Sequence, residues 1–259
     1  MLTSIRNPRV RAARGLHRSR ERRATGRHLV EGPRAVVEAL AAGVVEELYL
    51  DEARAVELTA AWRLAPDVGD VEVQVHQVTA DMLAAMCDAT SPQGVVAVAR
   101  TEPASLQELG AGVVVVLDRI ADPGNAGTVL RTADALGVAA VVLTAGSVDP
   151  YAPKTVRAAV GSTYHLPVVT GVTLAEVADH AHATGRRVVG LDAAGGGTLE
   201  VLRAADRALT LVLGNEAHGL DPTGRELLDE VVAIDLDGRA ESLNVAAAAA
   251  IAIHAATRG

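Results

Sequence analysis

Short runs of Val, Leu and Ala, apolar at almost every position, alternate with helical segments along much of the chain. In the C-terminal part these runs include VVVVLD (113–118), AAVVLT (139–144) and ALTLVLG (208–214). A strand without polar alternation is buried on both faces, which is typical of a parallel sheet covered on both sides by its crossover helices. The pattern therefore predicts an α/β fold, and the residues alone favour an open, doubly wound sheet.

The expected elements form two units joined by a polar stretch. Residues 1–100 are predicted to be a basic arm and a small α/β unit, with strands near 27–32, 46–51, 71–78 and 94–100 and helices near 33–43, up to about Leu64, and near 80–87. Residues 101–112 (TEPASLQELGAG) carry Gly and Pro among polar residues and are predicted to be a linker. The second unit, residues 113–259, adds strands near 165–170, 186–193 and 231–236, helices near 123–137, 153–161 and 173–184, and a closing helix from about Ser242.

Composition narrows the class of protein. The 259 residues are 49% hydrophobic, yet no apolar run approaches the roughly 20 residues that a membrane-spanning helix needs. Cys87 is the single cysteine, which excludes an intrachain disulfide and a zinc site built on several cysteines. The Arg-rich N-terminus has no apolar segment of the kind found in secretory signals, and the eight His are scattered without metal-ligand spacing. We therefore expect a cytoplasmic protein with no membrane partner and no bound metal.

Positive charge is concentrated at the N-terminus, although the whole chain carries a formal net charge of −8. Residues 1–34 contain ten Arg and two Glu, a net charge of +8, whereas residues 35–259 carry −16. Such an arm favours contact with phosphates, and the alternative is a charged helix face exposed to water. The arginines expected to meet phosphates are Arg6, Arg9, Arg11, Arg14, Arg18, Arg22 and Arg23.

Three of the expected strands are followed by the same arrangement, a Gly-bearing loop with amide and acid side chains and then a helix. The segments are RIADPGNAGTVLRTADALG (119–137), NEAHGLDP (215–222) and DGRAESLNVAAAAAIAIHAATR (237–258). Glycine lets the backbone approach a ligand closely, and the start of each helix offers free N–H groups. Ligands of parallel sheets bind beyond the carboxyl ends of the strands. The three loops are therefore predicted to form one pocket.

These loops also carry a resemblance to a known family. DPGNAGTVLRTADALG (122–137), LVLGNEAHGL (211–220) and ESLNVAAAAAIAIH (241–254) resemble, in order and spacing, motifs 1, 2 and 3 of the SpoU (TrmH) family, part of the SPOUT superfamily of S-adenosylmethionine-dependent RNA methyltransferases. The likeness covers about residues 113–258, and residues 7–40 and 91–100 are similar to the family's small α/β substrate-recognition domain. The resemblance implies methyl transfer from S-adenosylmethionine to a ribose 2′-hydroxyl of RNA, a C-terminal SPOUT-type parallel sheet with a trefoil knot, and a homodimer. Ribosomal RNA is expected as the substrate rather than transfer RNA.

The resemblance also implies the site residues. Catalytic roles fall on Asn125, Arg131, Glu216, Ser242 and Asn244. The methyl donor is expected to be held, largely through backbone atoms, by Leu213, Gly214, Asn215, Gly219, Ile234, Leu236 and Leu243. Arg157, within PKTVRAAVGS (153–162), matches a recurring arginine that is expected to face RNA. The chain departs from the family at AIDLDG (233–238), where Asp235 stands in place of the usual proline.

Each assignment has a simpler alternative that the sequence leaves open. Arg131 is alternatively an exposed arginine on an amphipathic helix, Asn125 and Ser242 are alternatively helix N-caps, and Glu216 is alternatively a solvated loop acid. If Arg131 is catalytic, it either accepts a proton or holds ribose and phosphate in place. The second role is favoured because a guanidinium stays protonated.

Other parts of the chain and its overall function also have alternative interpretations. RRVVGLDAAGGGTLEVL (186–202) resembles the strand and loop of Rossmann-type methyltransferases, but about 57 residues follow it, too few for such a sheet, so a Gly-rich connection is predicted. His218 is expected in a loop and His254 on a helix away from the pocket. A transfer-RNA methyltransferase and a non-catalytic RNA-binding protein stay open as functions, although the presence of all five motif residues together favours an enzyme.

Overall fold

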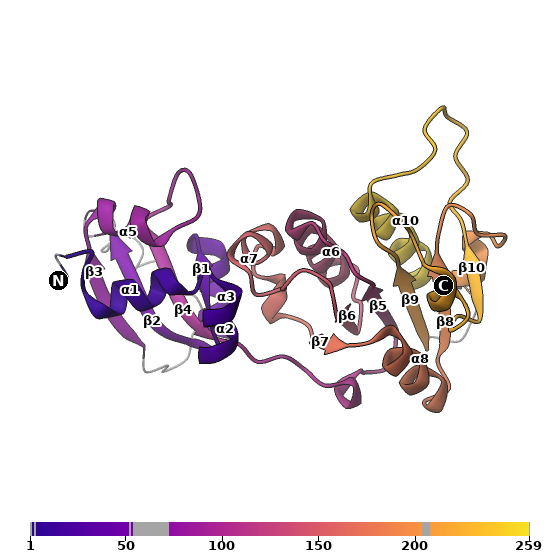
Figure 1. Ribbon diagram of the computed structural model, residues 1–259, viewed down its shortest axis with the longest axis horizontal. Coiled ribbons are helices and arrows are strands. Elements are labelled where there is room, and N and C mark those ends of the chain that lie inside the picture. Colours follow the sequence, from indigo (N-terminus) through magenta and orange to yellow (C-terminus); the bar gives the residue numbers. More distant parts are fainter. Residues whose placement is uncertain (1, 3, 52, 54–72, 204–207, 259) are drawn as a thin grey trace. The chain divides into compact units, whose positions relative to one another are not determined.

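The computed structural model describes residues 2, 4–51, 53, 73–203 and 208–258 (Figure 1). The chain separates into two compact units. The first contains residues 1–102 and 149–165, and the second contains residues 103–148 and 166–259. The chain first passes between the units inside the stretch predicted to be a linker. Residues 149–165 group with the first unit although they follow part of the second unit in the sequence. The predicted division into consecutive domains does not contain this feature.

The first unit is built on a four-stranded mixed sheet in the order β1-β4-β2-β3. Its strands are β1 (Arg27–Glu31), β2 (Val45–Asp51), β3 (Gln74–Val78) and β4 (Val95–Arg100). Strand β4 is antiparallel to β1 and β2, while β2 and β3 are parallel. The helices are α1 (Pro8–Gly15), α2 (Ser19–Thr25), α3 (Pro33–Ala41) and α5 (Ala80–Met86). The helix predicted to end near Leu64 lies outside the described residues.

Two apolar clusters form the core of this unit. One joins α3 to residues of β1, β2 and β4, and includes Val36 and Leu40. The other joins α1 and α5 to residues of all four strands, and includes Val10 and Met86. Since successive strand residues point to opposite faces, the sheet is covered on both sides. Only a sheet of this kind explains why β4 is buried at five consecutive positions.

The segment 149–165 belongs to the first unit because it is held there by polar and apolar contacts. It contains α7 (Pro153–Ala159) and the short 3₁₀ helix η2 (Ser162–Tyr164). Arg22 Nη2 lies 2.6 Å from Asp149 Oδ2, and the ring of His28 is 2.9 Å from the hydroxyl of Tyr164. The α7 side chain Val156 is fully buried in the cluster built on α3.

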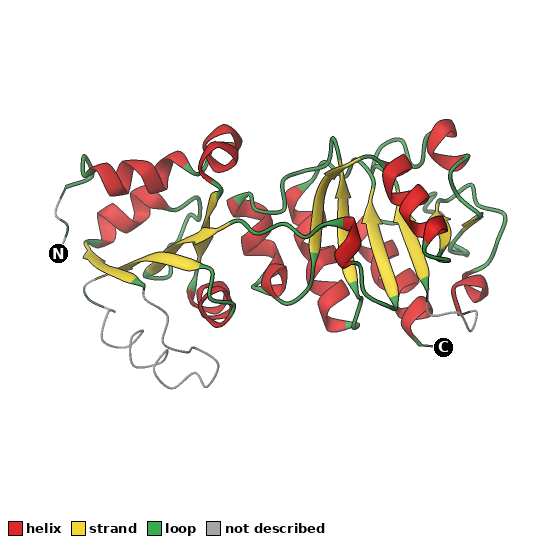
Figure 2. Ribbon diagram, turned by 90° about the horizontal axis from the view of Figure 1, so that it is seen from below, coloured by secondary structure: helices red, strands yellow, loops and turns green. Residues whose placement is uncertain are grey.

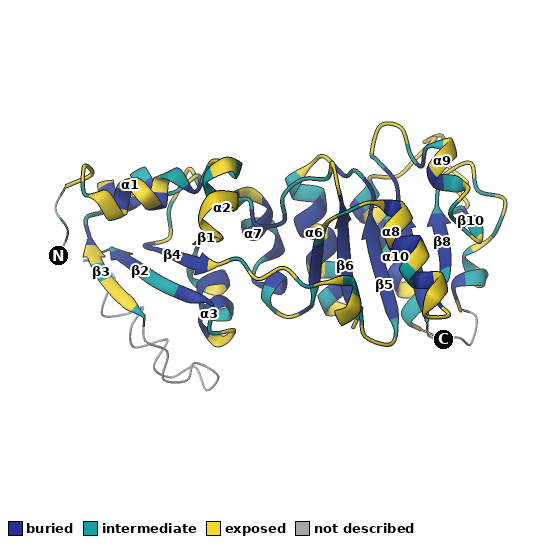
Figure 3. Cartoon of the chain, turned by 60° about the horizontal axis from the view of Figure 1, so that its bottom comes forward, coloured by how far each residue is buried: buried dark blue, intermediate teal, exposed yellow. Residues whose placement is uncertain are grey.

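The second unit contains a six-stranded sheet in the order β10-β8-β9-β5-β6-β7, with every adjacent pair parallel. Its strands are β5 (Val113–Leu117), β6 (Ala140–Thr144), β7 (Val168–Val172), β8 (Arg187–Leu191), β9 (Leu209–Leu213) and β10 (Glu230–Val232). Every residue of β5, β6 and β9 is buried, as Figure 3 shows for β5 and β6. The predicted parallel sheet is therefore confirmed.

Helices cover both faces of this sheet (Figure 2). They are α6 (Pro123–Ala135), α8 (Leu174–Ala183), α9 (Pro222–Arg225) and α10 (Val245–Thr257), with the 3₁₀ helices η1 (Leu106–Glu108) and η3 (Leu199–Arg203). Helix α8 packs against β8, and its residues Val177 and Ala181 belong to one apolar cluster with Val114 and Val116 of β5. Helices α6 and α10 pack against each other. No helix in the described part of the chain combines the length and apolarity required to span a membrane.

Two boundaries differ from the sequence-based expectation. The strand expected over 231–236 ends at Val232, and the last helix begins at Val245 rather than near Ser242. Its N-cap is Asn244, whose side chain accepts a hydrogen bond from the backbone N–H of Ala246, so the N-cap role considered for Ser242 is wrong. Likewise Asp122, and not Asn125, is the N-cap of α6.

Candidate active site

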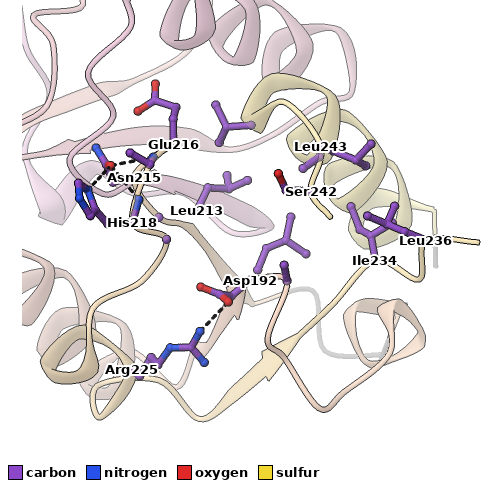
Figure 4. Close-up of a pocket in the computed structure, with 17 residues that line it drawn as sticks. Asp192, Leu213, Asn215, Glu216, His218, Arg225, Ile234, Leu236, Ser242 and Leu243 are labelled. Carbon is purple, nitrogen blue, oxygen red and sulfur yellow. Dashed lines mark hydrogen bonds and ion pairs between the residues drawn. The ribbon is translucent and has the colours of Figure 1, made fainter. Parts of the chain in front are cut away.

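A cavity of about 340 Å³ lies in the second unit at the carboxyl ends of β8 and β9 (Figure 4). The two strands are in register, because Leu191 at the end of β8 pairs with Leu213 at the end of β9. The loops after β8, β9 and β10 and the start of α10 supply the walls. The lining residues are Leu191, Asp192, Ala193, Leu213, Gly214, Asn215, Glu216, Ala217, His218, Gly219, Arg225, Ile234, Leu236, Ser242, Leu243, Val245 and Ala248.

All seven residues that the resemblance assigns to the methyl donor lie in this lining. Four of them, Leu213, Ile234, Leu236 and Leu243, present aliphatic side chains. Leu236 and Leu243 are 37% and 38% exposed, which is unusual for large apolar side chains. An apolar side chain that faces a cavity instead of the core is typical of a small-molecule site.

The turn after β9 depends on two glycines. The backbone N–H groups of Asn215 and Gly219 donate to each other's carbonyls at 3.1 and 2.8 Å. A Cβ on Gly214 would lie 2.4 Å from the carbonyl carbon of Gly219, so no other residue fits there without opening the turn. Gly219 itself has a φ of 62°, in the left-handed region that favours glycine. The turn therefore places backbone atoms directly against the cavity.

Glu216 links this turn to the start of α6. Its carboxylate accepts hydrogen bonds from the backbone N–H groups of Ala121 and Asp122 at 3.1 and 3.2 Å, and from Asn125 Nδ2 at 3.2 Å. Burial alone would raise the pKa of Glu216, but its own backbone N–H and these three donors outweigh the effect of burial and hold the pKa below its usual value. The side chain is therefore a fixed carboxylate at neutral pH.

Asn244 extends the same network to α10. Its Nδ2 donates to Asn125 Oδ1 at 3.0 Å, while its Oδ1 accepts from the N–H of Ala246 at 2.9 Å. Both ends of this amide are thus used within the protein. Through Glu216, Asn125 and Asn244 the structure brings the three motif segments into one hydrogen-bonded network.

Arg131 is not part of this network. It lies on α6, is exposed, and does not line the cavity. Within the described residues, no hydrogen bond or ion pair holds its guanidinium. Ser242 does line the cavity, from the exposed loop before α10.

Sequence reasoning missed a charged pair in the lining. Arg225 Nη2 lies 2.6 Å from Asp192 Oδ1, and Figure 4 shows the guanidinium reaching this carboxylate. A signal for Asp192 was present, since it follows a buried strand and precedes glycines as the three predicted loops do. His218 is a loop residue as expected, but it lines the cavity, whereas His254 on α10 does not.

The predicted RNA-contacting arginines have two different environments in the first unit. Six of them are exposed and belong to the segment that contains α1 and α2: Arg6, Arg9, Arg11, Arg14, Arg18 and Arg23. Arg22 is 6% exposed, pairs with Asp149, and donates to the carbonyls of Leu16 and His17. Four of the five guanidinium N–H donors of Arg22 are used in this way, so the structure shows it as a buried ion pair, unlike the six exposed arginines.

Arg157 also has partners inside the first unit. Its side chain is 36% exposed and lies 3.0 Å from Glu31 and 3.4 Å from Asp88. The carboxylate of Glu31 also accepts hydrogen bonds from the backbone N–H groups of Asp88 and Ala89. The position fixes Arg157 beside a loop that follows α5 and leaves a third of its surface open.

Comparison with known proteins adds the following findings. Residues 112–254 match the model of the SpoU rRNA Methylase family, and residues 7–97 match that of the MRM3-like substrate binding domain. The 23S rRNA (guanosine(2553)-2′-O)-methyltransferase RlmP of Bacillus subtilis is 35% identical over 255 residues, which cover 98% of this chain and 97% of that protein. An AdoMet-bound rRNA methyltransferase from Sinorhizobium meliloti has a TM-score of 0.87 at 30% identity, covering 99% of this chain and 97% of that one. The SpoU methyltransferase AviRb from Streptomyces viridochromogenes, in complex with AdoMet (S-adenosylmethionine), has a TM-score of 0.86 at 30% identity, covering 98% of both chains.

Proposed function

The chain belongs to the SpoU rRNA methylase family, and from this premise we propose that it transfers a methyl group from S-adenosylmethionine to a ribose 2′-hydroxyl of ribosomal RNA. The observation that carries the proposal is the cavity at the carboxyl ends of β8 and β9, to which two motif segments contribute Gly214 and Ser242 and the loop after β10 contributes Ile234. Relatives that match nearly the whole chain are named as 23S rRNA and rRNA methyltransferases, and two structural neighbours, an rRNA methyltransferase and a SpoU methyltransferase, contain AdoMet.

The lining fits a donor that carries an adenosine. Four aliphatic side chains suit the faces of a purine ring, and the turn from Gly214 to Gly219 offers backbone N–H and C=O groups to its polar edges. The volume of about 340 Å³ lies within the roughly 300–1,000 Å³ typical of small-molecule sites. When bound, S-adenosylmethionine supplies an electrophilic methyl group on a sulfonium centre. We assign the holding of the donor to Leu213, Gly214, Asn215, Gly219, Ile234, Leu236 and Leu243.

The network of Glu216, Asn125 and Asn244 is proposed to position the reacting groups. Glu216 fixes the start of α6 against the turn after β9, and Asn244 fixes the start of α10 against Asn125. Because both ends of the Asn244 amide are already bonded, its role is to orient Asn125 and the loop that carries Ser242. The hydroxyl of Ser242 lines the cavity and is free to accept or donate a hydrogen bond to the attacking ribose hydroxyl.

Arg131 is proposed to hold the RNA rather than to accept its proton. A guanidinium stays protonated at neutral pH, and its planar fork matches a phosphate. The exposed position on α6 leaves all of its donors available to a backbone phosphate and to ribose. Holding a nucleophile in line with the methyl group lowers the activation barrier of the transfer by a large share.

We propose that the enzyme acts as a homodimer. Arg131 is exposed and does not line the cavity of its own chain, which favours a site that a second copy completes. Helix α10, which packs beside α6, also exposes Ile251 at 41%, an apolar group suited to an interface. The trefoil knot implied by the resemblance stays a prediction, as does a cytoplasmic location.

The first unit is proposed to bind the RNA substrate. Six exposed arginines in the segment 6–23 give it a basic face, and residues 7–97 match a substrate binding domain. Arg157 contributes the exposed third of its guanidinium beside the loop after α5. Because these contacts are to phosphates, affinity should fall steeply with salt.

Mapping of 2′-O-methyl groups in RNA from a deletion strain and its parent tests the proposal. A site in 23S rRNA that is lost in the deletion strain and restored by the wild-type gene, but not by an Arg131→Ala gene, is the expected result. Loss of a site in transfer RNA instead would assign the alternative substrate. If the purified protein bound no S-adenosylmethionine in calorimetry, the catalytic proposal would be wrong and a non-catalytic RNA-binding role would replace it.

A further inference from the structure

Asp192 lies next to the proposed donor site without having a place in any of the family motifs. It follows the last residue of β8, just as Gly214 follows the last residue of β9, and these strand ends pair in register. Leu191, Asp192 and Ala193 all line the cavity. A carboxylate is therefore present at the edge of the sheet where ligands of parallel α/β proteins bind.

The carboxylate of Asp192 is held in one orientation. Oδ1 accepts from the N–H of Ala194 at 2.9 Å and from Arg225 Nη2 at 2.6 Å, and Oδ2 accepts from the N–H of Leu220 at 3.1 Å. Burial alone would raise the pKa of Asp192, but the three donors outweigh it and lower the pKa. The group stays an anion at neutral pH and cannot rotate without breaking several hydrogen bonds.

One acceptor position of Asp192 is still open. A carboxylate oxygen can accept two hydrogen bonds, and Oδ2 accepts one from the described residues. The other acid in the lining, Glu216, also accepts a single hydrogen bond at one of its oxygens, Oε2, but its three donors all hold the carboxylate at the start of α6. Figure 4 shows the two acids at different ends of the cavity, with Leu213 between them. Asp192 is thus the acid available to a ligand that lies over the aliphatic residues.

The chemistry of this acceptor favours a hydroxyl over a cation. Arg225 already neutralises Asp192, so a second positive group would gain little from the pair, whereas a neutral O–H gains a charge-assisted hydrogen bond. An adenosine whose base lies over the aliphatic side chains carries its ribose hydroxyls directly beside that base. Acidic residues at the ends of parallel strands bind ribose in this way in dinucleotide sites.

We infer that Asp192, oriented by Arg225, accepts a hydrogen bond from a ribose hydroxyl of the methyl donor and sets the enzyme's preference for a ribonucleoside donor. The inference rests on the proposed function, since it takes the cavity as the donor site. Arg225 acts through Asp192 and is a positioning residue. Asp192 Oδ2 lies close to the turn because residue 219 is a glycine. A Cβ at Gly219 would lie only 2.6 Å from this oxygen.

Calorimetry with the full chain and three probes tests the inference. The probes are S-adenosylhomocysteine and its 2′-deoxy and 3′-deoxy analogues. Wild type should bind one deoxy analogue about 10- to 100-fold more weakly than the parent, the range of one hydrogen bond to a charged group. Asp192→Asn should weaken binding of the parent by a similar factor and weaken that deoxy analogue by less than about threefold, because the contact is already missing. Asp229→Asn is the matched control, since Asp229 also accepts a backbone N–H but does not line the cavity.

Two results would overturn the inference. One is a wild type that binds both deoxy analogues within threefold of the parent, a measurement that needs no variant and stands even if Asp192→Asn unfolds. The other is an Asp192→Asn protein that loses the same factor for the parent and for the deoxy analogue, which would show that Asp192 only holds the turn. A wild type that binds no probe would instead reject the proposed function, and the inference with it.

Discussion

Substitution of Gly214 by alanine tests whether the closed turn after β9 holds the donor. The added Cβ would lie 2.4 Å from the carbonyl carbon and 2.6 Å from the carbonyl oxygen of Gly219, and 2.6 Å from the backbone nitrogen of Leu220. All three are backbone atoms, so no side chain can rotate away. The turn has to open, and the two hydrogen bonds between Asn215 and Gly219 are then strained or lost.

The expected cost follows from these contacts. Two backbone hydrogen bonds contribute about 1 kcal/mol each, and the shift of the backbone adds a similar amount, which together give about 2–3 kcal/mol. If the donor binds only the closed turn, this cost appears in its dissociation constant as a loss of about 30- to 150-fold. The fold should survive, because β9 itself stays buried in the centre of the sheet.

Isothermal calorimetry with S-adenosylhomocysteine measures the loss, and thermal unfolding shows that the variant is folded. Gly196→Ala is the matched control, since a Cβ there meets no atom within 4 Å and the residue is exposed. It should change the dissociation constant by less than about threefold. Binding by Gly214→Ala within threefold of wild type would refute the reasoning, because the turn could then open without affecting the donor.

Three further predictions concern other parts of the chain. Arg131→Ala should keep donor affinity within about threefold and lower the transfer rate by more than about 100-fold, as measured by calorimetry and single-turnover methylation; near-normal transfer would refute its role. Arg186→Met should lower the free energy of unfolding by about 2–4 kcal/mol in denaturant titrations. The reason is that Arg186 is only 7% exposed and its guanidinium donates to the carbonyls of Gly110, Gly112 and Leu209. The control Arg187→Met should change the free energy of unfolding far less. Burial lowers the pKa of His28 to about 3, so the unfolded chain takes up a proton below about pH 6.5 that the folded chain does not; stability should fall by about 2 kcal/mol from pH 7.5 to 5.0, and His28→Gln should remove that slope.

The parallel sheet was predictable because its strands carry the signal locally. VVVVL in β5 and LTLVL in β9 are buried at every position. A strand needs apolar residues at every position only when the sheet is covered on both faces. The same signal predicts a strand over 231–236, but β10 ends at Val232. Ile234 and Leu236 are apolar because they line the cavity, and periodicity cannot distinguish a ligand-facing side chain from a core one.

The site was predictable as a set of loops but not as a set of contacts. Ser242 and Asn244 are both good N-cap residues, and the choice of Asn244 accompanies its hydrogen bond to Asn125, 119 positions away in sequence. The burial of Arg22 depends on its ion pair with Asp149, 127 positions away. Asp192 has a local signal in the sequence, because it follows a buried strand and precedes glycines. The same glycines also fit the Gly-rich connection predicted over 186–202.

The placement of residues 149–165 in the first unit has a consequence for how such proteins can be recombined. Strands β6 and β7 are adjacent in one sheet, yet the chain that joins them belongs to a different compact body. A single cut in the linker would leave Val156 and Tyr164 without the apolar and polar partners that bury them. An exchange of the first unit between relatives therefore has to transfer two separate gene segments together, although they are not contiguous in the sequence.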